Sequence, residues 1–305
     1  MPRNIITQLE ELFEKKFADI SFNKLNVGFT NEVFLVEEKF ILKICTKKEN
    51  EINFENEINF YKNNNDNNKI PRVVKFSSDS EKGNKKYILM EKVDGISIYN
   101  IWHTLDDSDR ENIINQISEF MKSTHKNIGV SYDWTGYILQ KLIKNLNAIR
   151  ELNLISELQH QDYLKIIKEK SMVLNSDNFN LVHADLHFDN ILITNNKDIK
   201  LIDFETSFYA PMDYELDIFL RMCRMTWKYA SEEAEQFVKH EDYLNIESWL
   251  KKYYSDIFEI KNLEARLLFY DLEANLRLLP RFPSDSELLK ISKEIIEKIK
   301  NIELI

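Results

Sequence analysis

The stretch "LVHADLHFDNILIT", residues 181–194, places two histidines, two aspartates and an asparagine between two apolar runs. Polar residues at this density indicate a metal cluster, a catalytic loop or a polar turn between strands. His183, Asp185, His187 and Asp189 alternate along the chain, and alternate side chains of a strand share one face. One interpretation is therefore a metallohydrolase in which His183, Asp185 and His187 bind Zn²⁺ or Mn²⁺.

A second interpretation treats the same residues as a phosphoryl-transfer loop. Protein kinases carry H-R-D-L-x-x-x-N, in which the Asp orients the attacking hydroxyl and the Asn binds Mg²⁺. His183, Asp185, Leu186 and Asn190 occupy this pattern, with alanine in place of the arginine. The pattern requires a second magnesium carboxylate at the end of a strand. Asp203 in "IKLIDFE", 13 residues after Asn190, meets that requirement.

Phosphoryl transfer also requires a cation for the nucleotide phosphates, and "FILKI" contains Lys43. A lysine flanked by apolar residues is costly to bury unpaired, so we expect a carboxylate and a phosphate beside it. Glu57 lies 14 residues further on, in a segment with helical periodicity, and is the expected partner. Glu51 and Glu55 are weaker alternatives.

The segment "YILMEKVDG" ends where a linker strand would offer backbone groups to a nucleobase. We predict contacts from the Glu91 carbonyl and the Val93 amide, with Met90 lining the back of the pocket or belonging to the ordinary core. The phosphate loop "NVGFTNEVF" has Gly28 alone in place of G-x-G-x-x-G. Backbone donors around Thr30 are expected to reach a phosphate.

These five elements, in this order, resemble the aminoglycoside phosphotransferase and choline kinase family, whose members have a protein-kinase-like fold. The resemblance covers nearly the whole chain and is most specific in "HADLHFDNIL" and "KLIDFE". It implies a kinase that uses Mg²⁺ to transfer the γ-phosphate of ATP or GTP to a hydroxyl of a small molecule. Asp185 would act on that hydroxyl, while Asn190 and Asp203 would bind the metal.

Ala184 replaces the arginine that in many protein kinases pairs with a phosphate on a regulatory loop. The interval from Asp203 to the helix expected near Met212 is also too short for a long regulatory loop. The sequence therefore predicts an enzyme that is always assembled, acting on a small molecule.

The elements around these motifs predict an α+β, bilobal protein-kinase-like fold. Residues 1–92 contain about five strand-like runs and one helix after the third, and we assign them to a small antiparallel-sheet lobe that binds nucleotide. Residues 93–305 are mainly helical and form the expected catalytic and substrate-binding lobe. Within it, "SDRENIINQISEFMKSTHKNI" is a strongly amphipathic helix with Ser108 or Asp109 as the expected N-cap.

The net charge of −10 argues against nucleic acid as a partner. Residues 1–92 carry 16 basic and 15 acidic side chains, whereas the remainder carry 25 and 36, a net of −11. The excess of acidic side chains in residues 93–305 indicates either a solvated surface or a region that attracts a cationic substrate. The substrate candidates are His187, Glu205, Asp213 and Asp271.

The two cysteines form no spacing motif and are expected to be buried thiols in a reducing compartment. No apolar run is long enough to span a membrane, so we expect a cytoplasmic monomer. The acceptor stays open among aminoglycosides, choline, sugars and amino alcohols, and a role in antibiotic resistance is one possibility. A catalytically inactive nucleotide-binding scaffold is the remaining alternative class.

Overall fold

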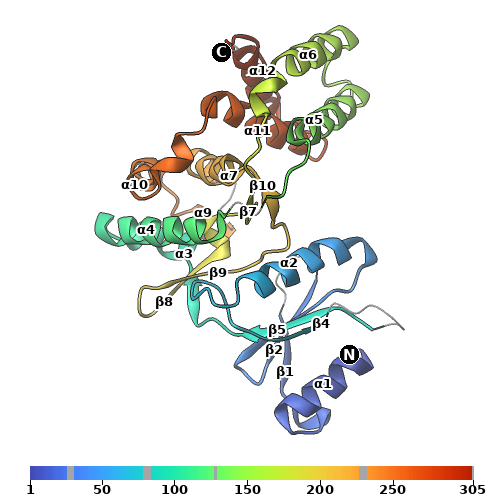
Figure 1. The fold of residues 1–305 in the computed structure, drawn as a ribbon, viewed down its shortest axis with the longest axis vertical. Coiled ribbons are helices and arrows are strands. Elements are labelled where there is room, and N and C mark those ends of the chain that lie inside the picture. The colour runs from blue at the N-terminus through green and yellow to red at the C-terminus, as the bar shows by residue number, and fades with distance from the viewer. Residues whose placement is uncertain (26–30, 78–83, 127–128, 227–231, 304–305) are drawn as a thin grey trace. The chain divides into compact units, whose positions relative to one another are not determined.

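The structure, a computed structural model, describes residues 1–25, 31–77, 84–126, 129–226 and 232–303. The chain divides into two compact units. Unit 1 comprises residues 1–120, 183–208 and 227–242, and unit 2 comprises residues 121–182, 209–226 and 243–305. Figure 1 labels the helices and strands of both.

Unit 1 contains a five-stranded antiparallel sheet in the order β1-β2-β3-β5-β4. Its strands are β1 (Phe22–Leu25), β2 (Glu32–Val36), β3 (Phe40–Ile44), β4 (Val73–Ser77) and β5 (Tyr87–Glu91). The helix α2 (Glu51–Asn63) follows β3, which confirms the predicted five strands and inserted helix. The β2–β3 turn has positive φ at Glu37 and Glu38, a primed turn whose twist suits a tight hairpin.

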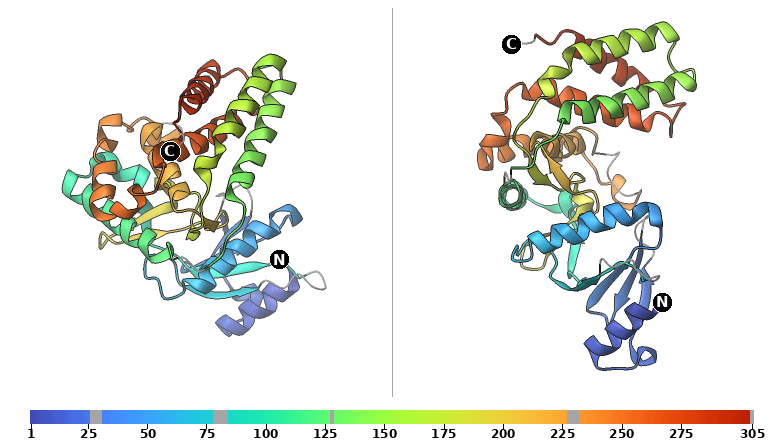
Figure 2. Two further views of the ribbon diagram at one scale, coloured as in Figure 1. Left: turned by 45° about the horizontal axis from the view of Figure 1, so that its top comes forward. Right: turned by 45° about the vertical axis from the view of Figure 1, so that its right-hand side comes forward.

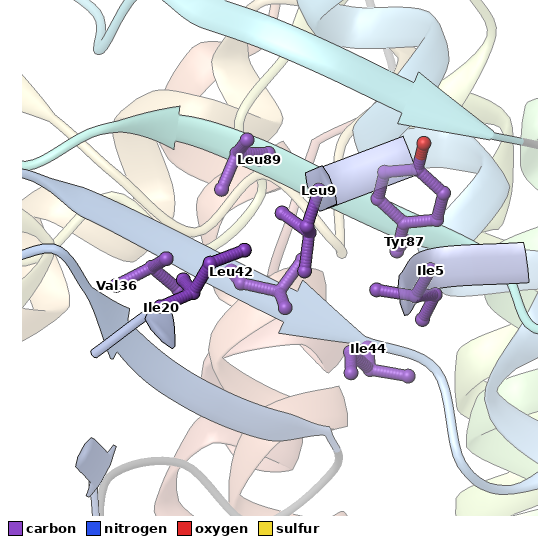
Figure 3. Close-up of a cluster of buried hydrophobic side chains, with 8 residues drawn as sticks. All are labelled: Ile5, Leu9, Ile20, Val36, Leu42, Ile44, Tyr87 and Leu89. Carbon is purple, nitrogen blue, oxygen red and sulfur yellow. The ribbon is translucent and has the colours of Figure 1, made fainter. Parts of the chain in front are cut away.

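The two faces of this sheet are covered by different helices (Figure 1). On one face, α1 (Arg3–Phe13) packs into an apolar cluster shown in Figure 3. The members of this cluster are Ile5, Leu9, Ile20, Val36, Leu42, Ile44, Tyr87 and Leu89. Because side chains alternate along β3, Ile41 and Lys43 point to the opposite face, where α2 lies.

The rest of unit 1 contains a three-stranded sheet in the order β6-β8-β9. Its strands are β6 (Gly95–Ser97), β8 (Ile191–Thr194) and β9 (Ile199–Leu201). Its helices are α3 (Ile98–Ile101), most of α4 (Asp107–Thr124) and α9 (Glu232–Glu235). The N-cap prediction for α4 was wrong, because the Asp106 carboxylate accepts from the Asp109 amide at 2.8 Å and the helix begins at Asp107.

Unit 2 is mainly helical. Its helices are α5 (Trp134–Glu151), α6 (Glu157–Lys170), α7 (Asp213–Arg224), α10 (Ile246–Tyr253), α11 (Leu263–Leu278) and α12 (Ser286–Lys300). The helix α11 packs against α5, α7 and α12, and α6 packs against α5 and α12, as Figure 2 shows. The short strands β7 (Asn180–Val182) and β10 (Phe208–Ala210) form a two-stranded sheet.

Short 3₁₀ turns connect several elements. They are η1 (Phe17–Asp19), η2 (Lys48–Asn50), η4 (Trp102–Thr104), η5 (Ser171–Leu174), η6 (Phe188–Asn190), η7 (His240–Tyr243) and η8 (Ser255–Phe258). Cys45 and Cys223 are buried free thiols, as expected. Within the described ranges, no helix is both long and apolar enough to cross a membrane.

Substitution of Leu42 tests how much the apolar cluster beneath α1 contributes to stability. The Leu42 side chain is fully buried, so Leu42→Ala should lower the free energy of unfolding by about 2–5 kcal/mol through lost burial and a residual cavity. Ile52→Ala, at a residue of α2 that is 72% exposed, should change it by less than about 0.5 kcal/mol. Denaturant unfolding of both variants measures the difference, and equal effects would contradict the assigned core.

Candidate active site

The β8–β9 hairpin brings together two candidate residues that are 13 positions apart in sequence. Ile191 lies opposite Leu201 in the antiparallel register, so Asn190 and Ile202 flank the open end of the hairpin. The Ile202 amide donates to the Asn190 carbonyl at 3.0 Å and closes this end. Asp203 follows immediately with φ of +64°, a left-handed conformation that redirects the chain after the strand.

Lys43 joins the five-stranded sheet to this hairpin. Its Nζ lies 2.8 Å from Glu57 Oε2 on α2 and 2.7 Å from Asp203 Oδ1. The Lys43 side chain is 12% exposed and that of Glu57 is 1% exposed, whereas Asp203 is 41% exposed. The predicted Lys43–Glu57 pair therefore forms, and the lysine also reaches the carboxylate that follows β9.

Burial and charge oppose each other in this ion-pair group. Burial alone would lower the pKa of Lys43, but the carboxylates of Glu57 and Asp203 outweigh it and raise that pKa. For Glu57, burial is the largest effect and raises its pKa to about 6, although Lys43 acts in the opposite direction. Lys43 is therefore a permanent cation, while Glu57 has a pKa of about 6.

The segment after β7 arranges Asp185, His187 and Asn190 around one another. The Asn190 Nδ2 group donates to the Asp185 carbonyl at 2.9 Å and to Asp185 Oδ2 at 3.3 Å. His187 Nε2 lies 3.5 Å from the same carboxylate oxygen. Since the Asn190 amide nitrogen is directed to Asp185, its acceptor oxygen is the atom left to face another ligand.

The His187 imidazole and the Asp185 carboxylate stabilise each other's charged forms. Burial alone would raise the pKa of Asp185, but the hydrogen bond and charge of His187, helped by His183 and Asn190, lower it below the usual value. Burial alone would lower the pKa of His187, and the Asp185 carboxylate raises it instead. Asp185 is consequently an anion at neutral pH and 46% exposed, so it can accept a proton or hydrogen bond.

His183 has a structural role in this loop. Its buried Nε2 donates to the Ile202 carbonyl at 3.0 Å, and its ring packs on Phe204. The His183 carbonyl in turn accepts from Thr206 Oγ1 at 3.0 Å. Across the described residues, no three His, Cys, Asp or Glu side chains gather as a metal-binding group. The geometry thus does not support the metallohydrolase interpretation of His183, Asp185 and His187.

A cavity of about 330 Å³ in unit 1 adjoins these groups. Its polar end contains Lys43, Glu57, Asn190 and Asp203. Its remaining lining is mostly apolar and comprises Leu25, Asn31, Val33, Ile41, Tyr61, Pro71, Met90, Glu91, Lys92, Val93, Leu192 and Ile202. An apolar slot with a few convergent polar groups is typical of a small-ligand site.

The linker after β5 lies at this cavity. The amides of Glu91 and Lys92 already donate to the carbonyls of Arg72 and Lys39, at 2.9 and 2.8 Å. Val93 is therefore the next linker residue whose amide can meet a ligand in the cavity. Gly28 and Thr30, predicted for phosphate binding, lie outside the described residues.

The four substrate candidates have different environments. Glu205 Oε2 accepts from Asn31 Nδ2 at 3.0 Å, which ties the segment after Asp203 to the start of β2. In unit 2, Asp271 is 16% exposed and pairs with Arg224 at 2.8 Å.

Asp213, also in unit 2, is fully buried. Arg266 donates to both of its carboxylate oxygens, at 2.6 and 3.0 Å, and Tyr270 donates at 2.9 Å. The carboxylate of Asp213 thus has structural partners inside the unit, and the expected substrate contact does not fit this environment.

Sequence reasoning missed several groups around the site. Phe60 of α2 stacks on Phe204 with ring centroids 3.9 Å apart, which anchors the helix beside Asp203. Tyr61 lies one helical turn after Glu57 and lines the same cavity, so i, i+4 spacing could have found it. Ser97 donates to Asp189 at 3.0 Å, a pairing that no local pattern indicates.

Comparison with solved structures identifies the fold. The gentamicin complex of APH(2")-IIa matches with a TM-score of 0.61 and 17% identity, covering 98% of this chain and 96% of that one. The streptomycin–ATP–APH(2")-IIa ternary complex matches with a TM-score of 0.62 and 18% identity, covering 97% and 98%. The GDP complex of aminoglycoside 2'-phosphotransferase-IIIa matches with a TM-score of 0.58 and 17% identity, covering 98% and 99%. The chain thus has the protein-kinase-like fold of aminoglycoside phosphotransferases.

The family model described as "Phosphotransferase enzyme family" matches residues 21–245. The chain therefore belongs to the phosphotransferase enzyme family, and the predicted fold and family are confirmed. No curated protein matches the sequence.

Asp213 offers a test that separates a structural from a substrate-binding carboxylate. Asp213→Ala leaves the Arg266 guanidinium buried without its ion pair, so it should lower the free energy of unfolding by about 3–5 kcal/mol. Asp162→Ala, at an exposed position of α6, should have almost no effect. Chemical denaturation measures both, and a stable Asp213→Ala protein would argue against the structural assignment.

Proposed function

We propose that this protein is a small-molecule kinase that transfers the γ-phosphate of ATP or GTP to a substrate hydroxyl. The observation that carries the proposal is the convergence of Lys43, Glu57, Asn190 and Asp203 on one cavity, with Asp185 bonded to Asn190. The family match supports a phosphotransferase, and the cavity supports a nucleotide as the donor.

Each group has a proposed role. Lys43 is a permanent cation at the polar end of the cavity and would neutralise the nucleotide phosphates, while Glu57 holds its ammonium in place. The Glu91 carbonyl and Val93 amide would contact the base, with Met90 at the back of the pocket. Backbone groups near Gly28 and Thr30 would contact a phosphate.

Asp185 is proposed to orient the substrate hydroxyl and accept its proton as the hydroxyl oxygen attacks the γ-phosphorus. The bond from that phosphorus to the β-phosphate oxygen breaks, and the nucleoside diphosphate leaves. A lowered pKa makes Asp185 a weak base, which suits a reaction that depends mainly on positioning and charge stabilisation. His187 holds the carboxylate in its charged form.

Asn190 and Asp203 are the residues that would hold Mg²⁺. An amide oxygen and a carboxylate are hard oxygen ligands, and Mg²⁺ typically takes one or two such protein groups together with phosphate and water. Asn190 directs its nitrogen to Asp185, while Asp203 has one oxygen on Lys43 and is 41% exposed. When bound, Mg²⁺ would neutralise charge on the β- and γ-phosphate oxygens.

Aminoglycosides are the first acceptor class to test, because two of the matched structures contain gentamicin and streptomycin. The net charge of −11 over residues 93–305 favours a cationic acceptor. His187 and Glu205 are the proposed acceptor contacts of unit 1. Asp271 is a further candidate if the acceptor replaces its ion pair with Arg224. Asp213 is not proposed, because Arg266 and Tyr270 already bind its carboxylate.

We further propose that residues 1–92 act as the nucleotide-binding lobe and residues 93–305 as the catalytic and substrate-binding lobe. A cytoplasmic monomer that needs no nucleic acid or membrane for activity fits this function. Choline-like alcohols and sugars are the alternative acceptors for the same site.

Asp185→Asn tests the mechanism. This change keeps the shape of the side chain but removes the anion, so phosphate transfer should fall by about 10²- to 10⁴-fold. Binding of Mg·ATP, measured by calorimetry, should change little, because Asp185 is not among the residues lining the cavity. Asp198→Asn, at an exposed turn position, is the matched control.

The assay is a transfer screen over aminoglycosides, choline-like alcohols and sugars, with ATP and GTP as donors. Full turnover by Asp185→Asn would refute the proposed base. Intact nucleotide binding by the wild-type protein without transfer to any acceptor would instead favour the inactive scaffold.

Protonation of Glu57 should cause kcat/KM for the nucleotide to fall on the acidic side of its pH profile, which we call the acidic limb. Above about pH 6 its carboxylate holds Lys43, and below that pH it is neutral, so kcat/KM should fall as the pH drops from 7 to 5. Because its folded-state pKa is raised, Glu57 alone adds stability at low pH that is lost as the pH rises through about 6. The loss of activity should therefore precede unfolding. Glu57→Gln should remove this limb, and an unchanged limb in that variant would assign it elsewhere.

A further inference from the structure

The side chain of a second lysine, Lys86, lies on the same face of the five-stranded sheet as that of Lys43. Lys86 immediately precedes β5, and its carbonyl accepts from the Cys45 amide at 3.0 Å. Cys45 lies two positions after Lys43, and residues two apart along an extended chain share a face. The register that pairs Lys43 with Ile88, two positions after Lys86, agrees with this placement.

The Lys86 ammonium is held by two carboxylates of α2. Its Nζ lies 2.5 Å from Glu55 Oε1 and 3.1 Å from Glu51 Oε2. Glu51 and Glu55 are one helical turn apart, so a single cation can contact both. Burial alone would lower the pKa of Lys86, but hydrogen bonds to the two glutamates raise it. At 5% exposure the lysine side chain is well buried, although its partners are 36% and 47% exposed.

The same helix presents Glu57 to Lys43, so α2 meets one face of the sheet through two separate ion-pair groups. Neither Lys86 nor its partners Glu51 and Glu55 are among the residues that line the cavity. Its contribution to the site therefore acts through the helix. A displacement of about 1 Å in α2 would be enough to break the 2.8 Å contact between Lys43 and Glu57.

The negative charge of α2 explains why the pairing of Lys86 with Glu51 and Glu55 matters. Glu51 and Glu55 share one side of the first two turns, whereas Glu57 lies on a different side, where Asp203 and Glu205 also raise its pKa. Without Lys86, the carboxylates of Glu51 and Glu55 would lose the cation that pairs with both of them. Stacking of Phe60 on Phe204 secures α2 further along, whereas the Lys86 ion pairs act at its first turns.

We propose that Lys86, with Glu51 and Glu55, is a positioning residue that holds the first turns of α2 against the sheet and thereby sets the Lys43–Glu57 contact. The proposal rests on the proposed kinase function for its catalytic consequence. Its structural part, the anchoring of α2, stands without that function.

Hydrogen exchange of the full-length protein tests the structural part. In Lys86→Met, which keeps the apolar stem, backbone amides of residues 51–57 should exchange about tenfold faster than in the wild type. Lys86→Arg can span both glutamates and should restore protection. Lys69→Met removes a comparable part-buried ion pair, with Glu119, and should leave α2 unchanged. Unchanged exchange in Lys86→Met overturns the proposal.

Mg·ATP hydrolysis without acceptor tests the catalytic part. Lys86→Met should lower kcat/KM by about tenfold, whereas Lys86→Arg and Lys69→Met stay within about twofold of the wild type. In a Glu57→Gln background, Lys86→Met should add less than about twofold, since both changes act on the same contact. Independent, additive losses would mean that Lys86 does not act through Glu57 and would overturn the proposal.

The helix side offers a second route if Lys86→Met does not fold. Glu51→Gln with Glu55→Gln alters two part-exposed positions and should give the same faster exchange and the same loss of hydrolysis. A wild-type protein that neither binds nor hydrolyses Mg·ATP would refute the kinase function instead. The hydrogen-exchange experiment would still decide whether Lys86 anchors α2.

Discussion

The site of unit 1 depends on the buried ammonium of Lys43 and the two carboxylates around it. An ammonium that is 12% exposed is unfavourable unless it is paired, and Glu57 and Asp203 supply the pairing from α2 and from the end of β9. One cation thereby connects the five-stranded sheet, its covering helix and the β8–β9 hairpin. A phosphate group entering the cavity would meet a charge that is already in position, so little reorganisation is needed on binding.

The rest of the site follows from how strongly its supports are held. The hairpin register sets Asn190 against Ile202, the stack of Phe60 on Phe204 holds α2 beside Asp203, and the α1 core closes the other face of the sheet. These supports are apolar contacts and backbone hydrogen bonds, which do not titrate. Glu57, whose pKa burial raises to about 6, is held by these supports, so a change of pH around that value acts on its charge and not on the frame.

Local sequence patterns predicted much of this arrangement. Asp203 could be foreseen at the end of a strand because it follows the apolar run in "IKLIDFE", and Lys43 could be foreseen because a lysine inside "FILKI" needs a partner. Asp213 shows where such reasoning fails. An acidic residue at the start of a helix reads equally well as a substrate contact, and only the position of Arg266, 53 residues later, shows that it is a buried ion pair.

The sequence by itself determined the family, the order of the strands and helices, and the choice of Asp185, Asn190, Asp203 and Lys43 as candidate site residues, because these depend on residue types and short spacings. Only the tertiary structure decided which of three glutamates on α2 pairs with Lys43, and that the other two bind Lys86. The sequence ranked Glu57 first among the three, but all three lie within two helical turns, and spacing alone does not fix which side of the helix faces the sheet. The packing of α2 on the sheet places Glu57 at Lys43 and leaves Glu51 and Glu55 at Lys86, and that packing is made by residues distant in the sequence, such as Phe60 and Phe204.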